Sequence, residues 1–327
     1  MAGTKTLNVQ WAINEAIKEE MERDPSVFIV GEDVGKPGGP FGVTRGLIDQ
    51  FGAGRCVDTP ISEGAIVGLC VGAAASGLRP VAEIMFMNFI TLTVEEFYNQ
   101  ASKMRWMFGG QVKVPMVVRA MTAGGFGAGP HHSSSLEAWF ASMPGMKVVM
   151  PSNSYTAKGL MKAAIRDDNP VLYVEPLSSY KLKMEIPTDD YICPIGKAMV
   201  TREGKDITIV SIGRMLQEAM KAADKLKADG IEAEVIDLLC VNPIDMDTIY
   251  ASVKKTNRCV IIHEAKKVMG VGAEIAANLQ ENLFDWLDAP VARVAAPFTH
   301  IAFQPKLEKH YFPDADKLIA QVKKMIG

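Results

Sequence analysis

The apolar positions of this chain follow two spacings, one typical of helices and one typical of buried strands. From residue 8 to residue 22, apolar side chains recur at helical spacing. The uncharged run 27–30 then predicts a buried strand, which ends at Gly31-Glu32-Asp33. Because this order of helix and strand repeats along most of the chain, the sequence predicts an α/β fold.

The first half of the chain carries most of these repeats. Strands are predicted at 79–86, 113–119, 146–150 and 171–175, and helices near 64–77, 93–107 and 153–167. Strands that are apolar almost throughout indicate a parallel sheet with helices on both faces. The pattern lapses from Pro176 to Pro194, which is polar and has no clear period, so we interpret it as an irregular connection.

A second, smaller α/β domain is predicted after this connection. Its strands are expected at 207–212, 232–238, 258–263 and 291–295, and its helices at 214–229, 245–255, 272–287 and 314–326. We place the first domain at 1–185, the linker at 186–198 and the second domain at 199–327.

Composition and charge narrow the function classes. A length of 327 residues suits two domains, and a net charge of −3 without a basic run favours neither nucleic acid nor an anionic membrane as a partner. The uncharged stretch Gly64–Leu78 is too short to cross a bilayer, so we interpret it as a tightly packed core helix. Five unpatterned cysteines and an N-terminus without an apolar signal segment indicate a cytoplasmic protein with free thiols.

Several motifs of α/β enzymes do not occur in the sequence. Gly31-Glu32-Asp33-Val34-Gly35 after the first strand does not match the dinucleotide fingerprint, and there is no lysine-containing phosphate loop or G-x-S-x-G elbow. Gly270-Val271-Gly272 is too short a pattern to indicate a cofactor. The Gly-Asp-Gly motif that binds the pyrophosphate of thiamin diphosphate is also missing.

Three polar clusters interrupt the apolar surroundings. They are Glu32-Asp33, the segment 58–64 that contains Glu63, and the glycine-rich loop 124–133 that ends at His131-His132-Ser133. In open parallel sheets, sites collect at the carboxyl ends of strands, and all three clusters are expected at such an edge. The sequence therefore predicts that they share one site.

Each cluster also has a simpler explanation. Glu32-Asp33 could end a strand or cap a turn, and Glu63 could be an acid that favours a helix N-terminus. The histidine pair could be an ordinary exposed loop, although histidine is well suited to proton transfer near neutral pH. These patterns alone leave both explanations open.

The chain resembles the beta subunits of the decarboxylase components of 2-oxoacid dehydrogenases, a family that includes the pyruvate, branched-chain and acetoin enzymes. The segment Asp58-Thr59-Pro60-Ile61-Ser62-Glu63 and the pair His132-Ser133 carry much of the likeness. Residues 41–47 and 136–140 are nearest to the acetoin type. Further matching segments are 30–34, 72–74, 77–80, 144–145, 157–160, 164–171, 263–265 and 270–274.

The resemblance implies a thiamin diphosphate site shared between two chains. The beta subunit supplies the half that holds the aminopyrimidine, and an alpha subunit supplies the pyrophosphate half with its magnesium ion, which accounts for the missing Gly-Asp-Gly. Glu63 matches the glutamate that shares a proton with a pyrimidine nitrogen. Glu32, Ile61, Met85 and Phe89 match residues around the same pocket.

His132 matches a family histidine that serves proton transfer or acylation of the lipoyl group. The usual glutamines on either side of the family's His-Ser pair are His131 and Ser134 here, which puts the substrate in question, and the separate roles of His131 and His132 stay open. The segments 176–184, 240–242 and 266–267 also depart from the usual family sequence.

A structural potassium ion and two protein partners also follow from the resemblance. The residues that match the ion site are Met116, Ala164, Ile165, Asp167 and Asn169. The resemblance implies an alpha-two beta-two heterotetramer and a lipoyl acyltransferase that accepts the acyl group. A helix-ending turn is the simpler explanation for residues 167–170.

The leading hypothesis is an oxidoreductase subunit that acts on a 2-oxoacid or on acetoin and works only with its alpha subunit. Two alternatives remain: a split, transketolase-like enzyme that transfers ketol units, and a structural subunit without catalysis. Phosphate recognition would favour the first alternative, yet the loop 120–135 offers no basic side chains except its two histidines.

Overall fold

The computed structural model describes residues 3–327 and divides their strands among three sheets. The strands of the first half are β1 (Thr4–Asn8), β2 (Val27–Gly31), β3 (Cys56–Asp58), β4 (Arg79–Phe86), β5 (Val117–Thr122), β6 (Lys147–Val149), β7 (Val171–Pro176) and β8 (Lys183–Pro187). Those of the second half are β9 (Met199–Arg202), β10 (Ile207–Ser211), β11 (Ala233–Asp237), β12 (Cys240–Asn242), β13 (Cys259–Lys266) and β14 (Ala292–Ala296).

Helices connect most of these strands. The α-helices are α1 (Val9–Arg23), α2 (Leu47–Phe51), α3 (Glu63–Ala75), α4 (Ser102–Met107), α5 (Glu137–Ala141), α6 (Ser154–Arg166), α7 (Met215–Ala228), α8 (Met246–Thr256), α9 (Val271–Leu283), α10 (Pro305–Tyr311) and α11 (Ala315–Ile326). Short 3-10 helices lie at Phe89–Thr93 (η1), Leu177–Ser179 (η3) and Phe284–Trp286 (η4), and a π-helix (η2) at Glu96–Ala101.

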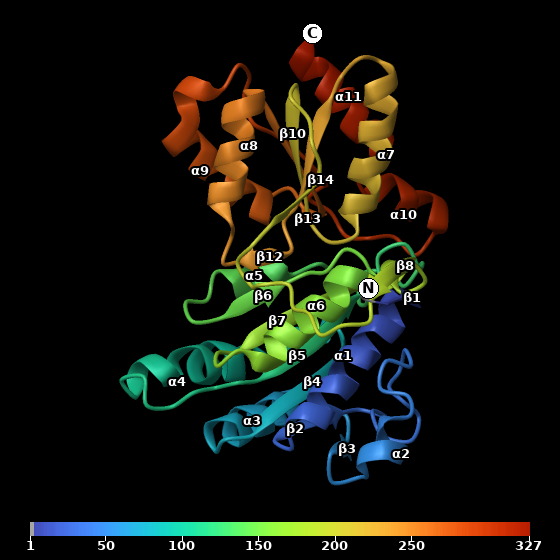
Figure 1. Cartoon of the computed structure of the whole chain (residues 1–327), viewed down its shortest axis with the longest axis vertical. Coiled ribbons are helices and arrows are strands. Elements are labelled where there is room, and N and C mark those ends of the chain that lie inside the picture. Colours follow the sequence, from blue (N-terminus) through green and yellow to red (C-terminus); the bar gives the residue numbers. More distant parts are fainter. Residues whose placement is uncertain (1–2) are drawn as a thin grey trace.

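The first sheet has the strand order β12-β6-β7-β5-β4-β2-β3. Its six strands from the first half of the chain run parallel, whereas β12 pairs antiparallel with β6. One face is covered by α1 and α6, and the other by α3, η1, η2 and α4 (Figure 1). Both faces are therefore buried, which explains why these strands are apolar almost throughout.

The second sheet has the order β14-β13-β10-β11-β9, with only β9 antiparallel. Helices α7 and α11 cover one face, and α8 and α9 cover the other (Figure 1). The predicted fold class, two α/β domains with mostly parallel sheets, is confirmed.

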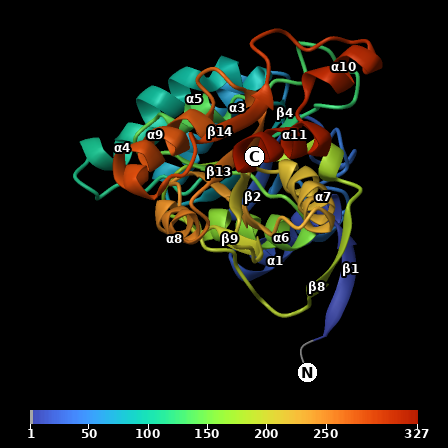
Figure 2. The ribbon, with the colours of Figure 1, turned by 90° about the horizontal axis from the view of Figure 1, so that it is seen from above.

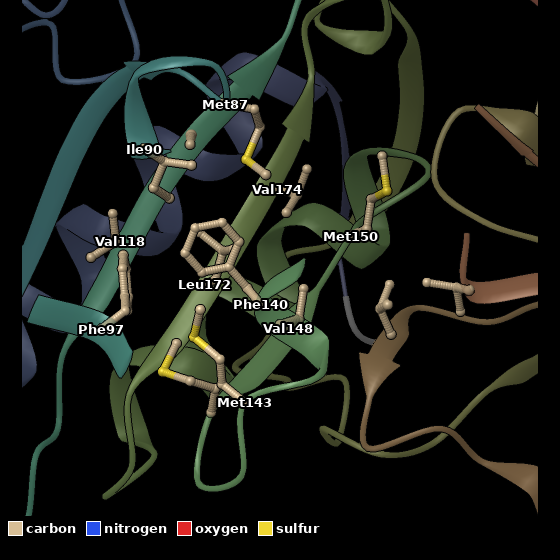
Figure 3. Packing of buried hydrophobic residues seen from close by; sticks show 14 of the residues in the cluster. Met87, Ile90, Phe97, Val118, Phe140, Met143, Val148, Met150, Leu172 and Val174 are labelled. Atoms are coloured by element: carbon tan, nitrogen blue, oxygen red, sulfur yellow. The ribbon is translucent and has the colours of Figure 1, made fainter. Parts of the chain in front are cut away.

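The two domains share a continuous apolar core. Side chains of the first sheet, such as Val148, Leu172 and Val174, belong to the same buried cluster as Ile212 and Leu238 of the second domain. Figure 3 shows the part of this cluster around Phe140, where residues of β5, β6 and β7 point to one face. Strand β12 extends this connection, because it comes from the second half of the chain and completes the first sheet.

Some predicted elements differ from the structure. The segment 176–194, predicted to be irregular, contains β8, which pairs with β1 in a ribbon that projects beside the first domain (Figure 2). The strand expected at 113–119 begins later, at Val117, and the helix expected at 93–107 is divided among 3-10, π and α segments.

Helix α3 is less enclosed than a core helix would be. It buries Ile66, Val67 and Cys70, but the Leu69 side chain is 47% exposed. One apolar face of α3 therefore lies at the surface. Among residues 3–327, no helix has the length and apolar character needed to cross a bilayer.

Asp237, at the end of β11, lies at the junction between the domains. The hydroxyl of Ser152, which follows β6, donates a hydrogen bond to its carboxylate. Burial raises the pKa of Asp237 from its ordinary value of 3.8 to about 7. Because the folded protein holds this proton more tightly than the unfolded chain, stability should fall as the pH rises from about 4 to about 7.

The substitution Asp237→Asn removes this titration. The variant is expected to exceed the wild type in free energy of unfolding by about 1–3 kcal/mol at pH 7.5, and by less at pH 5. Urea unfolding at both pH values measures the difference, with Asp285→Asn, an exposed position, as the control. A gain that does not depend on pH would contradict the prediction.

Candidate functional site

The carboxyl ends of three adjacent strands bring the predicted residues to one edge of the first sheet. Strand β2 pairs in parallel with β4, and β4 pairs in parallel with β5. Glu32 directly follows β2, Met85 lies near the end of β4, and the glycine-rich loop follows β5. The parallel register therefore places Glu32, Met85 and the His132 loop at the same edge.

Glu63 reaches this edge from the neighbouring strand. Gly31 of β2 is paired with Asp58 of β3, and the chain then turns through residues 59–62 into α3, whose first residue is Glu63. The Glu63 side chain is buried at 9% exposure, but Ile61 beside it is 80% exposed. Within residues 3–327 the Glu63 carboxyl has no hydrogen-bond or ion-pair partner, so it is available to a ligand.

Glu32 is the second acid of this edge. Partial burial raises the pKa of the Glu32 carboxyl, and the negative charges of Glu63 and Asp33 raise it further. Glu32 follows β2 and Glu63 follows β3, and because these two strands are paired in parallel, both carboxyls belong to the same edge. Gly31 gives β2 its close approach to β4, because a Cβ there would lie 2.7 Å from the backbone oxygen of Glu83.

His132 is surrounded by aromatic rings. Its imidazole lies edge-on to Phe86, with ring centres 4.8 Å apart, and edge-on to Phe89 at 5.6 Å. Nδ1 lies 3.2 Å from the carbonyl oxygen of Ala128. Because a carbonyl only accepts, Nδ1 carries the proton in the neutral ring, and Nε2 is then the nitrogen that can accept one.

The neighbouring histidine is in a different environment. His131 is exposed, whereas His132 is partly buried against the two phenylalanines. The structure therefore distinguishes two residues that the sequence could not separate.

Asn88, which sequence reasoning missed, holds the end of the His132 loop. Its side-chain nitrogen donates to the carbonyl oxygen of Pro130 at 3.0 Å and to the Ser134 hydroxyl at 2.9 Å. Its side-chain oxygen accepts from the backbone nitrogen of Ser134 at 3.0 Å. Ser134, one of the two loop residues that depart from the family pattern, is thus part of this anchor.

A buried ion cluster lies beneath the site. The Arg119 guanidinium of β5 contacts the Glu83 carboxylate of β4 at 2.5 Å and the Glu175 carboxylate of β7 at 2.6 Å, and the Tyr180 hydroxyl donates to Glu175. Burial raises the pKa of Glu83, and the charge of Glu32 contributes to this rise. Charged residues inside otherwise apolar strands were the signal in the sequence that could have revealed this cluster.

The residues predicted for potassium surround the turn after α6. The carbonyl oxygens of Ile165 and Asp167 both accept from the Arg79 guanidinium at 2.9 Å, and the Asn169 side-chain oxygen accepts from Arg105 at 2.7 Å. The carbonyl of Met116 accepts a backbone hydrogen bond from Val171. The Ala164 carbonyl accepts one from Asp167. Arg79 and Lys147 already place positive charge on two of the residues predicted to bind the ion, Ile165 and Asp167.

The Gly270-Val271-Gly272 segment has a packing role. A Cβ at either glycine would lie within 3 Å of the buried His263 ring. Its position at the start of α9 brings the helix close to β13, which explains the glycines without a cofactor.

A groove of about 890 Å³ lies elsewhere, at the end of α4, and is lined by residues that include Arg105, Trp106 and Pro170. It contains none of the residues predicted to contact the cofactor. At the edge that carries Glu63, the Ile61 side chain is 80% exposed.

Family comparisons agree with this two-domain arrangement. Residues 5–183 match the pyrimidine binding domain of transketolase, and residues 196–318 match the transketolase C-terminal domain. A solved structure described as a split gene transketolase, an inactive beta4 tetramer, superposes with a TM-score of 0.81 over 98% of both chains at 24% identity. At that identity the likeness shows the fold alone.

Similarity to curated proteins is higher and extends over the full chain. The beta subunit of acetoin:2,6-dichlorophenolindophenol oxidoreductase from Bacillus subtilis is 43% identical and is aligned over 99% of this chain and 98% of its own length. The 2-oxoisovalerate dehydrogenase beta subunit of the same organism is 46% identical over 96% and 97%. A mitochondrial pyruvate dehydrogenase E1 beta subunit of rice (Oryza sativa) is 42% identical over 99% and 87%.

The chain therefore belongs to the beta subunits of the thiamin-dependent dehydrogenases that act on acetoin and 2-oxoacids. The predicted family is confirmed, as is the enzyme class. The relatives give no support to the two alternative functions.

The ion cluster beneath the site allows a stability test. Arg119→Met would leave the Glu83 and Glu175 carboxylates buried without their cation, so we expect the free energy of unfolding to fall by about 3–5 kcal/mol. Equilibrium urea unfolding measures this change. Lys225→Met, which removes a surface pair with Asp316, should change the midpoint little, and a wild-type midpoint for Arg119→Met would overturn the expectation.

Proposed function

We propose that this chain forms half of an active site that either decarboxylates a 2-oxoacid or cleaves acetoin, and passes the acyl group to a lipoyl group. The observation that carries the proposal is the meeting of Glu63, Glu32 and the His132 loop at one sheet edge. The relatives named for acetoin, 2-oxoisovalerate and pyruvate support the same chemistry.

The residues at this edge fit the aminopyrimidine half of thiamin diphosphate. Glu63 offers a carboxyl with no protein partner among the described residues, and Glu32 beside it has a raised pKa. Together these two acids can hold a proton at a ring nitrogen of the cofactor. Thiamin diphosphate supplies the carbanion chemistry when bound, and the protein orients and tunes it.

Glu63 acts by keeping this proton in place. Its position at the first turn of α3 fixes the direction of the side chain, and the short path from β3 limits its movement. We propose that Ile61, Met85 and Phe89 line the pocket and exclude water from the shared proton. Met85 and Phe89 are half-buried, and Phe89 contacts the His132 ring edge-on, which supports this arrangement.

His132 moves a proton at its Nε2 atom. The carbonyl of Ala128 holds the proton on Nδ1, which leaves Nε2 to accept or return one as the acyl group is transferred. The edges of Phe86 and Phe89 hold the ring plane and reduce access of water. We assign this role to His132 and not to the exposed His131.

Among the possible substrates, we propose acetoin first. Phe41 of the acetoin-like segment packs edge-on against Phe86 at 5.4 Å, so this segment contacts the ring that adjoins His132. The acetoin, branched-chain and pyruvate relatives are about equally similar to this chain, so sequence identity does not select the substrate. Activity assays with acetoin, pyruvate and 2-oxoisovalerate would select it.

Because this chain supplies only the aminopyrimidine half of the cofactor site, the proposal requires partner proteins. We propose an alpha subunit that holds the pyrophosphate and magnesium, an alpha-two beta-two assembly, and a lipoyl acyltransferase that receives the acyl group. The names of the relatives as beta subunits support the alpha partner.

We also propose the division into 1–185, a linker at 186–198 and 199–327, and a cytoplasmic location. The buried, free state of all five cysteines supports a reducing compartment.

Substitution of Glu63 tests the mechanism. In the enzyme produced together with its alpha subunit, Glu63→Ala should reduce cofactor-dependent dye reduction by at least about 100-fold, because proton transfer at the cofactor is lost. Glu63→Asp should also lose most activity, since its carboxyl is one methylene short. Glu95→Ala, at an exposed position, serves as the control.

Full activity of Glu63→Ala would refute this mechanism. Turnover of sugar phosphates without turnover of pyruvate or acetoin would favour the ketol-transfer alternative. Thiamin diphosphate binding that is unaffected by Glu63→Ala and Ile61→Asp would favour a structural subunit.

A potassium ion at Met116, Ala164, Ile165, Asp167 and Asn169 is the last part of the proposal. An ion at concentration c that binds only the folded chain stabilises it by RT ln(1 + c/Kd), and so raises the unfolding temperature as its concentration exceeds Kd. We therefore expect a higher unfolding temperature in potassium chloride than in sodium or choline chloride at equal ionic strength. Equal temperatures in the three salts would remove the ion from the proposal.

A further inference from the structure

The glycine-rich loop that carries His132 is held from both domains. Asn88 of the first domain anchors the end of the loop at Pro130 and Ser134. The beginning of the loop lies against the second domain, where α10 follows the second sheet. The two anchors are far apart in sequence, and they meet only because the domains pack together.

Glu308 of α10 is the second anchor. Its two carboxylate oxygens accept the backbone N–H groups of Gly125 at 3.0 Å and Gly127 at 2.8 Å. The Glu308 residue is only 3% exposed, so water competes little for its carboxylate oxygens. A buried carboxylate with no cation in contact among the described residues depends on these two amides for its stabilisation.

Aromatic side chains from the same region support this contact. The Phe303 ring lies so close to Gly129 that any Cβ there would overlap it, and Phe312 lies against Gly124 in the same way. Arg214 is positioned over the Phe312 ring, 4.8 Å from its centre, and pairs with Glu264. The second domain thus provides a fitted surface for the beginning of the loop.

The loop needs such support because of its composition. Gly125, Gly127 and Gly129 all have positive φ angles. Glycine populates positive and negative φ about equally, so the sequence alone does not hold these residues in this conformation. Without external hydrogen bonds, this segment would sample many conformations, and His132 would move with it. Fixing two of its amides removes much of that freedom.

We propose that Glu308 is a positioning residue that acts through the His132 loop, so that the second domain controls the geometry of the catalytic histidine. This inference rests on the proposed function, because it presupposes the role of His132. Glu308 itself contacts neither substrate nor cofactor in this proposal. Its effect should therefore appear only where His132 acts.

A double-mutant cycle in the alpha–beta enzyme tests the proposal. Glu308→Gln preserves size but replaces one acceptor by a donor, and it should slow acyl transfer to free lipoamide by about tenfold at unchanged KM. His132→Ala should be slower still. The double variant should equal His132→Ala alone, because Glu308 has nothing left to position.

The possible outcomes distinguish the role of His132 from the role of Glu308. If His132→Ala keeps full activity, the proposed role of His132 fails. If His132→Ala is impaired while Glu308→Gln is fully active, or if the two effects multiply in the double variant, only the role of Glu308 is overturned.

Hydrogen exchange on the purified chain gives a second readout that does not need activity. Glu308→Gln should increase exchange of the amides at 124–132 by about tenfold and leave β10 and β13 unchanged. Glu281→Gln, an exposed carboxylate of α9, is the matched control and should change neither. Unchanged exchange in the loop, or faster exchange throughout the second domain, would contradict the proposal.

Discussion

The parallel pairing of β2, β4 and β5 is the constraint on which the candidate site depends. Because all three strands run in one direction, the residues that follow them arrive at one edge: Glu32 after β2, Phe86 at the end of β4, and the His132 loop after β5. Glu63 joins them only because β3 continues the same order. Because both faces of the sheet are buried and apolar, the polar site residues gather at the ends of its strands.

The sequence predicted the parts of the fold whose signal is local. Strand β4 and helix α6 agree closely with their apolar runs, and the site clusters follow strands as expected. What it could not predict depends on distant partners: β8 is defined by its pairing with β1, and β12 by its pairing with β6. Asn88 and Glu308 escaped notice for the same reason, since nothing near them in sequence indicates the loop that they contact.

The site edge is supported from below by charges in the sheet. Arg119 with Glu83 and Glu175 forms a compact ion cluster whose desolvation is offset by close hydrogen bonds and by Tyr180. The charge of Glu32 contributes to the raised pKa of Glu83, so the cluster is electrostatically linked to the carboxyls proposed to bind the cofactor. A rigid cluster of this kind limits the movement of the strands that carry the site, which is consistent with positioned proton transfer.

Strand β12 has a consequence for how the protein is made. The first sheet is finished by residues 240–242, which leave the ribosome long after β6 and well after the first domain's own strands. During synthesis, the edge of β6 is therefore unpaired and open to other strands until much of the second domain has emerged. Once the second domain has been synthesised, its strand β12 covers the edge of β6 and so prevents that edge from pairing with other strands.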